Sequence, residues 1–146
     1  MRNIKFLFIL LAGLVLVGGF FIWRGSGKAE EVLPSKSEYN LETLSNDEGG
    51  VVITAAPTLA RDAWSFEIVL DTHSVELDAD LQARAFLVAE DGREYQAVSW
   101  EGDPPGGHHR KGILKFKALS LKPTILMLKI RNVGAAPERS FEWKLL

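Results

Sequence analysis

Residues 63–71 read A-W-S-F-E-I-V-L-D, and this stretch decides the fold. Large apolar side chains stand at Trp64, Phe66, Ile68 and Leu70, and smaller or more polar residues stand at most of the positions between them. A period of two is typical of a β-strand that buries one face and exposes the other. The stretch therefore predicts a half-buried strand, and the rest of the chain can be compared with it.

Similar runs follow along the chain, separated by residues that favour turns. The predicted strands are residues 51–54, 64–71, 82–90, 93–100, 112–118, 124–131 and 139–145. Pro57 is expected to close the first run, and Asp91-Gly92 is a strong signal for a two-residue hairpin turn. Seven short strands of this kind predict an all-β, immunoglobulin-like β-sandwich over residues 49–146. A single helical turn is expected near residues 75–81.

The N-terminal segment has a different character. Residues 4–23 read I-K-F-L-F-I-L-L-A-G-L-V-L-V-G-G-F-F-I-W, with Lys5 as the only charge. About 20 apolar residues are enough for a helix to cross a bilayer, and the aromatic residues at the end suit the membrane interface. Residues 1–24 are therefore predicted to be one transmembrane signal anchor. The alternative is a cleaved signal peptide, with a weak cleavage option at Gly27-Lys28-Ala29.

The orientation of such an anchor follows from its flanks. Arg2 and Lys5 precede or begin the apolar run and Arg24 and Lys28 follow it, so the positive charges nearly balance. A short N-terminal tail usually stays in the cytoplasm, so the C-terminal domain is predicted to be extracytoplasmic on a single-pass plasma-membrane protein. Residues 25–48 are polar and rich in breakers, which predicts a flexible linker.

Composition excludes several classes of function. The chain has no cysteine, which rules out disulfide frameworks, thiol catalysis and cysteine-based zinc sites. The formal net charge is -2, with both signs interspersed, and no basic surface for nucleic acid is indicated. No G-x-S-x-G nucleophile elbow is present. The chain is therefore expected not to be an enzyme and not to bind nucleic acid.

The three histidines suggest one metal site. His73 follows one predicted strand, and His108 and His109 lie in the loop before another. Imidazole is a ligand for copper or zinc, and Asp71 could add a carboxylate. If the two loops meet at one end of the sandwich, these residues would form the site. The alternative is structural: His73 caps a turn, and His108 and His109 begin a strand.

Two further residues are candidates for a binding surface. Trp64 and Trp143 are in phase with buried positions, so they are expected in the core. Trp100 ends a predicted strand beside a loop that is rich in glycine and proline, and Arg110 lies at the other end of that loop. Trp100 is therefore predicted to be exposed or to pack against the loop, and Trp100 and Arg110 are the predicted binding surface.

The motifs T-H-S at 72–74 and W-E-G-D-P-P-G-G-H-H-R at 100–110 carry a resemblance. Over roughly residues 50–146 the chain resembles small membrane-anchored bacterial proteins of unknown function, which implies no activity. The sequence thus favours a membrane-tethered, extracytoplasmic, non-enzymatic module for binding or assembly. Its expected partners are the lipid bilayer and a protein in or at the membrane. The alternative is a metal-binding accessory protein that holds copper or zinc through the loop histidines.

Overall fold

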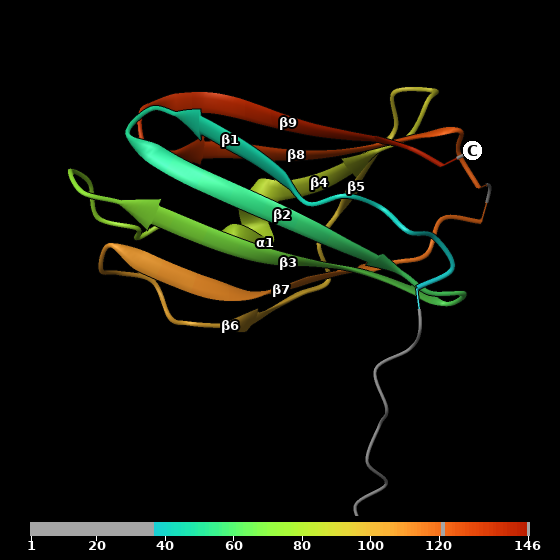
Figure 1. Ribbon diagram of the computed structural model, residues 1–146, viewed down its shortest axis with the longest axis horizontal. Coiled ribbons are helices and arrows are strands. Elements are labelled where there is room, and N and C mark those ends of the chain that lie inside the picture. The colour runs from blue at the N-terminus through green and yellow to red at the C-terminus, as the bar shows by residue number, and fades with distance from the viewer. Residues whose placement is uncertain (1–36, 121, 146) are drawn as a thin grey trace, which may run out of the picture. The chain divides into compact units, whose positions relative to one another are not determined.

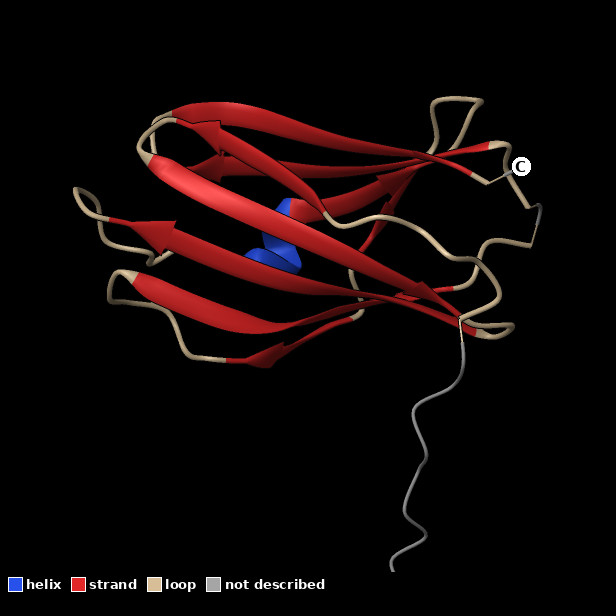
Figure 2. Ribbon diagram, in the orientation of Figure 1, coloured by secondary structure: helices blue, strands red, loops and turns tan. Residues whose placement is uncertain are grey.

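Nine strands form two antiparallel sheets in a computed structural model that describes residues 37–120 and 122–145. The five-stranded sheet has the order β1-β2-β3-β7-β6, and the four-stranded sheet has the order β5-β4-β8-β9 (Figures 1 and 2). The predicted all-β sandwich is confirmed. The predicted anchor at 1–24 lies outside the described residues, and the described part contains no helix long and apolar enough to span a membrane.

The strands of each sheet and the helix α1 have the following bounds. The five-stranded sheet contains β1 Leu44–Glu48, β2 Val51–Leu59, β3 Ala63–Thr72, β6 Ser99–Gly102 and β7 His109–Lys117. The four-stranded sheet contains β4 Ala85–Val88, β5 Glu94–Gln96, β8 Ile125–Val133 and β9 Ala136–Lys144. The helix α1 Leu81–Arg84 begins at the cap Asp80, whose carboxylate accepts a hydrogen bond from Ala83 N. The predicted strand at 82–90 is thus a helical turn followed by β4.

The folded domain begins before the predicted boundary at residue 49. Strand β1 pairs with β2 from Leu44 opposite Ala55 to Glu48 opposite Val51. Tyr39 and Leu41 also pack against the buried core, together with Leu44. These apolar side chains explain the order of a segment whose composition predicted a flexible linker. Residues 25–36 of that predicted linker lie outside the described part of the chain.

Pro57 does not end its strand, contrary to the sequence prediction. Strand β2 continues to Leu59, with Pro57 opposite Phe66 of β3. Leu59 N donates to Ser37 Oγ at 3.2 Å on the side away from β3. Residues two apart direct their backbone N atoms to the same side, and β1 ends opposite Ala55. The missing N–H of Pro57 therefore costs no ladder hydrogen bond.

The predicted strand at 93–100 is divided between the two sheets. Ala97 N donates to Ala85 O of β4 at 3.1 Å, whereas Val98 N donates to Lys115 O of β7 at 2.7 Å. The chain therefore crosses from one sheet to the other between these two neighbours. This crossing and the added β1 explain why the described residues hold nine strands and not the predicted seven.

The core lies between the inner faces of the two sheets. The Phe66 ring meets Phe116 edge-on and Trp143 at a tilt, each with ring centroids 5.6 Å apart. Trp64 and Trp143 are both buried, as the sequence predicted. Aromatic pairs of this geometry add to the stabilisation from burial of their apolar area. The alternating apolar side chains of the strands therefore give the two sheets one shared core.

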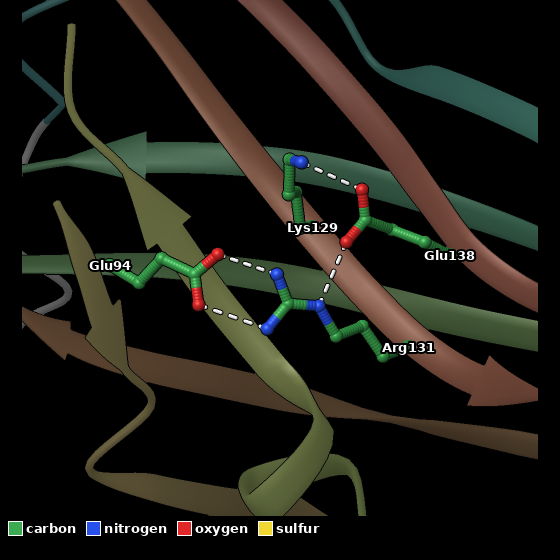
Figure 3. Close-up of polar contacts among 4 residues, drawn as sticks. All are labelled: Glu94, Lys129, Arg131 and Glu138. Carbon is green, nitrogen blue, oxygen red and sulfur yellow. Dashed lines mark hydrogen bonds and ion pairs between the residues drawn. The ribbon is translucent and has the colours of Figure 1, made fainter. Parts of the chain in front are cut away.

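The outer face of the four-stranded sheet has a different chemistry, shown in Figure 3. Arg131 binds both oxygens of Glu94, at 2.9 and 2.5 Å, and also binds Glu138 at 2.8 Å. Lys129 donates to the other oxygen of Glu138 at 2.6 Å. Hydrogen bonds from Lys129 and Arg131 lower the pKa of Glu138 below its usual value. These contacts connect β5, β8 and β9 across a solvated face.

Loops gather at the two ends of the sandwich, visible at left and right in Figure 1. The histidine end, as we call it, comprises the loops 49–50, 73–80, 103–108 and 134–135 with the strand ends beside them, including Asp71, Trp100, His109 and Arg110. The groove end comprises the loops 37–39, 60–62, 89–93 and 118–120 with 122–124, together with Val98 and Lys117. The hydrogen bond from Glu38 N to Leu59 O and the Lys122–Glu38 ion pair place the first described residues at the groove end.

Candidate functional site

The histidine end brings the two predicted loops together. Asp71 near the end of β3 is the register partner of His109 at the start of β7. Their side chains meet in a hydrogen bond between His109 Nδ1 and Asp71 Oδ1. Thr72 N donates to His108 O at 3.0 Å and holds the loops at this spacing. Two of the predicted ligands are therefore neighbours on the outer face of the sheet.

The structure does not gather a full set of metal ligands. His73 and His108 are both exposed, in the loop after β3 and in the bend before β7. Across residues 37–120 and 122–145, no three histidine, aspartate or glutamate side chains lie close enough to hold one ion. A zinc site usually has three or four protein ligands. The observed Asp71–His109 pair is an exposed cross-strand contact, as the structural alternative for His109 in a strand implies.

Arg110 is not on the surface, which corrects its predicted role. Its side chain points between the sheets and is 2% exposed. Its Nη1 donates to the carbonyls of Leu77 at 2.9 Å and Ala79 at 2.7 Å. Burial lowers the pKa of Arg110, and the nearby carboxylates, Asp103 foremost, oppose this effect. The guanidinium therefore ties the segment before α1 to β7 and is not available to a partner.

Trp100 packs beside Arg110 in the same part of the fold. Its Nε1 donates to Asp103 O at 2.9 Å, and the Arg110 guanidinium lies over its ring at 5.6 Å. A Cβ on Gly112 would lie only 2.6 Å from the Trp100 ring, so the glycine makes room for the indole. Trp100 thus covers the edge of the core beside β6 and is half-buried. Trp100 therefore takes the loop-packing role that the sequence left open, whereas Arg110 is buried and the two do not form an exposed surface.

A groove with a cavity volume of about 630 Å³ lies at the groove end. Its walls are the β4–β5 hairpin and the segment that follows β7. The apolar part of its lining contains Tyr95, Val98, Ala118, Leu119 and Pro123. Val98 is 48% exposed, the highest value among the exposed large hydrophobic side chains of the described residues. Apolar surface of this kind inside a concave site is typical of ligand-binding positions.

The hairpin wall is held in place by its acidic residues. The Glu90 carboxylate accepts from Thr124 N at 2.6 Å, from Ile125 N at 3.0 Å and from Thr124 Oγ1. The hydrogen bond from the Thr124 side chain, followed by those from the two backbone N–H groups, lowers the pKa of Glu90. The Asp91 carboxylate is engaged by Arg93 at 2.6 Å. The wall is therefore pinned to the start of β8, and its acids are already bonded.

The cations of the groove are not equally engaged. Lys122 is paired with Glu38 at 2.7 Å, and Arg93 is paired with Asp91. Lys117, at the end of β7, is exposed and makes no ion pair within the described part of the chain. The groove therefore offers apolar contact beside an ammonium group that can meet a carboxylate.

Sequence reasoning missed this groove because its residues look ordinary in the chain. Val98 lies inside a run predicted as one strand, and only the change of sheet after Ala97 exposes it. A signal was present, since Ala97 and Val98 are adjacent apolar residues that break the period of two. Comparisons with protein-family models, with curated proteins and with solved structures found no match. The resemblance noted for residues 50–146 stays a prediction.

Proposed function

We propose that this protein is a membrane-tethered, extracytoplasmic, non-enzymatic binding module of immunoglobulin-like fold. The strand orders β1-β2-β3-β7-β6 and β5-β4-β8-β9 support the fold assignment, because immunoglobulin-like sandwiches divide their strands between two antiparallel sheets in this manner. The apolar segment at residues 4–23 supports the tether. Binding residues on such a scaffold lie disproportionately in its loops and at the strand ends beside them.

The observation that carries the proposal is the coincidence of Val98, Lys117 and the groove. Among the described residues, the most exposed large hydrophobic side chain, Val98, and a cation without an ion pair, Lys117, line the same concave surface. The occupant is a segment of a protein partner that places an apolar side chain against Val98. A carboxylate of the same segment meets Lys117, as charge complementarity requires.

A peptide-display selection on the full-length protein in lipid nanodiscs tests this occupant. The wild-type protein is expected to enrich peptides with an apolar residue next to Asp, Glu or a terminal carboxylate. Lys117→Glu is expected to change the preference to peptides with Lys or Arg, because the charge that meets them is reversed. Lys111→Glu is the matched control, since Lys111 lies on the same strand away from the groove and pairs with Glu67 at 3.1 Å.

The contradicting outcomes are equally specific. If no peptide class is enriched, the groove is not a peptide site. If the Lys117→Glu and wild-type proteins select the same peptides, the Lys117 ammonium group does not bind a carboxylate of the peptide. If Lys111→Glu changes the selection as strongly as Lys117→Glu, the effect arises from net charge and not from the groove.

The topology has its own test. Protease added to intact cells is expected to remove the β-sandwich domain, because the short N-terminal flank of the anchor remains in the cytoplasm. The readout is the loss of a C-terminal tag with retention of an N-terminal tag. Protection of the C-terminal tag in intact cells, with cleavage after lysis, would reverse the orientation.

A further inference from the structure

The four edge strands of the sandwich differ greatly in length. Strands β1, β5 and β6 have 5, 3 and 4 residues, whereas β9 has 9. Soluble proteins usually keep edge strands short, because an unpaired row of N–H and C=O groups pairs readily with another strand. Strand β9 ends its sheet, and no strand pairs with its free side in the described part of the chain. One long edge thus lacks a paired strand, although the carbonyls of Glu42, Glu48 and Gly49 accept hydrogen bonds beside its two ends.

Space is available beside the C-terminal half of this edge. A second groove of about 490 Å³ is lined by Asn40, Leu41 and Glu42 on one side and by Glu142, Trp143 and Lys144 on the other. Trp143 Nε1 donates to Glu42 O at 2.8 Å and fixes the two walls relative to each other. The groove therefore lies between residues 40–42 and the C-terminal half of β9.

The exposed face of β9 is complementary in charge to itself. Its outward side chains are Glu138, Ser140, Glu142 and Lys144. Antiparallel pairing of two β9 strands about a two-fold axis at Phe141 places Glu138 opposite Lys144 of the second copy. It also places Ser140 opposite Glu142 of the second copy. Opposite charges directly across a strand pair stabilise the pair.

The neighbouring registers are disfavoured by the same residues. A two-fold axis at Ser140 would place Glu138 opposite Glu142 of the second copy. An axis at Glu142 would place Glu142 opposite itself. Like charges directly opposite each other destabilise a strand pair, and a shift by one residue would put exposed side chains opposite buried ones. The axis at Phe141 pairs residues 138–144, seven of the nine residues of β9, and among axes at residues 139–142 it alone places opposite charges across the pair.

We propose that two copies of this protein pair through β9, antiparallel about Phe141, and join their four-stranded sheets into one. A two-fold interface of this kind uses the same surface on both copies. Tethering to one membrane raises the local concentration of the domain and so favours such a contact. The pairing surface is separate from the groove at Val98 and does not depend on its occupant.

Cysteine crosslinking tests the register directly, because the chain contains no cysteine of its own. Two differently tagged full-length chains, Ser140→Cys and Glu142→Cys, are co-expressed and oxidised in native membranes. The expected product is a disulfide heterodimer well above either homodimer, because residues 140 and 142 face each other across the axis. The matched control is the pair Ser65→Cys and Glu67→Cys, which has the same spacing on the central strand β3.

Heterodimer formation no greater than that of the β3 control overturns the proposal. Homodimers of Ser140→Cys as abundant as the heterodimer overturn the register. Lys144→Glu added to both chains is expected to reduce the heterodimer at least about threefold. The reason is that the new carboxylate at position 144 of each chain would lie opposite Glu138 of the other chain. Val98→Asp is expected to leave the heterodimer unchanged, which separates this proposal from the proposed function.

Discussion

The two ends of the sandwich present opposite combinations of residue type and availability. The histidine end holds the chemically distinctive residues, yet Arg110 and Trp100 are bonded to their own neighbours there. The groove end holds ordinary residues, yet it leaves Val98 and Lys117 facing solvent beside a cavity of about 630 Å³. The difference teaches that residue type alone does not mark a binding site. What marks it is a side chain whose contacts the fold leaves incomplete.

The largest expected effect of a single change is at Arg110. Arg110→Met is expected to lower the free energy of unfolding by about 3 kcal/mol, because the carbonyls of Leu77 and Ala79 lose a charged donor inside the protein. The measurement is chemical denaturation of the full-length protein in detergent. A loss below about 1 kcal/mol would show that Arg110 does not organise the histidine end.

A second change tests the packing of Trp100. Gly112→Ala is expected to cost about 2 kcal/mol, because the added methyl lies 2.6 Å from the indole and 2.7 Å from Gly102 Cα. Indole fluorescence is expected to change as Trp100 is displaced. Lys111→Ala on the same strand is the control and should leave the fluorescence unaltered. A stable Gly112→Ala variant with native fluorescence would mean that Trp100 does not pack closely against Gly112.

Acid is expected to weaken the outer face that joins β8 and β9. The pKa of Glu138 in the folded protein lies below its usual value of 4.5, so its stabilising contribution is present above that value and is lost as the pH falls through the lower, folded pKa. The difference in Tm between the wild-type protein and Glu138→Gln should therefore shrink from about pH 7 to about pH 3. A constant difference over this range would attribute the effect of Glu138 to packing.

The smallest expected effects are at the histidines. His109→Ala should change the free energy of unfolding by less than about 1 kcal/mol, because the Asp71–His109 pair is exposed. One equivalent of Zn²⁺ or Cu²⁺ is expected to leave Tm unchanged, since only two ligands meet there and tight binding would stabilise the fold. A metal-dependent rise in Tm that His73→Ala or His109→Ala abolishes would restore the metal-binding alternative.

The strands were predictable wherever one face is buried against the core. The alternation around Phe66 and Phe141 correctly predicted β3 and β9, since both strands bury every second side chain. Strand β1 was not predictable, because Leu44 is the one bulky apolar residue of Leu44–Glu48 and its order comes from pairing with β2. The change of sheet at Ala97 and Val98 was missed for a similar reason, as tertiary hydrogen bonds decide it.

The candidate site was predictable only in part. The meeting of Asp71 with His109 follows from antiparallel pairing of their strands, which the sequence allowed. The burial of Arg110 did not follow, because its polar partners are backbone carbonyls of Leu77 and Ala79, which carry no sequence signal. The groove at Val98 depends on segments that are distant in the chain, and its one local sign is the break in the period of two at Ala97 and Val98.

The most direct test of the account is photocrosslinking from the two ends in native membranes. A photoreactive amino acid is placed at Val98 or at His73 of the full-length protein, and a peptide enriched by the wild-type protein is the competitor. The account predicts a discrete crosslink from position 98 that the peptide removes, and no peptide-sensitive crosslink from position 73. A peptide-sensitive crosslink at position 73 with none at position 98 would contradict it and return the working surface to the histidine end.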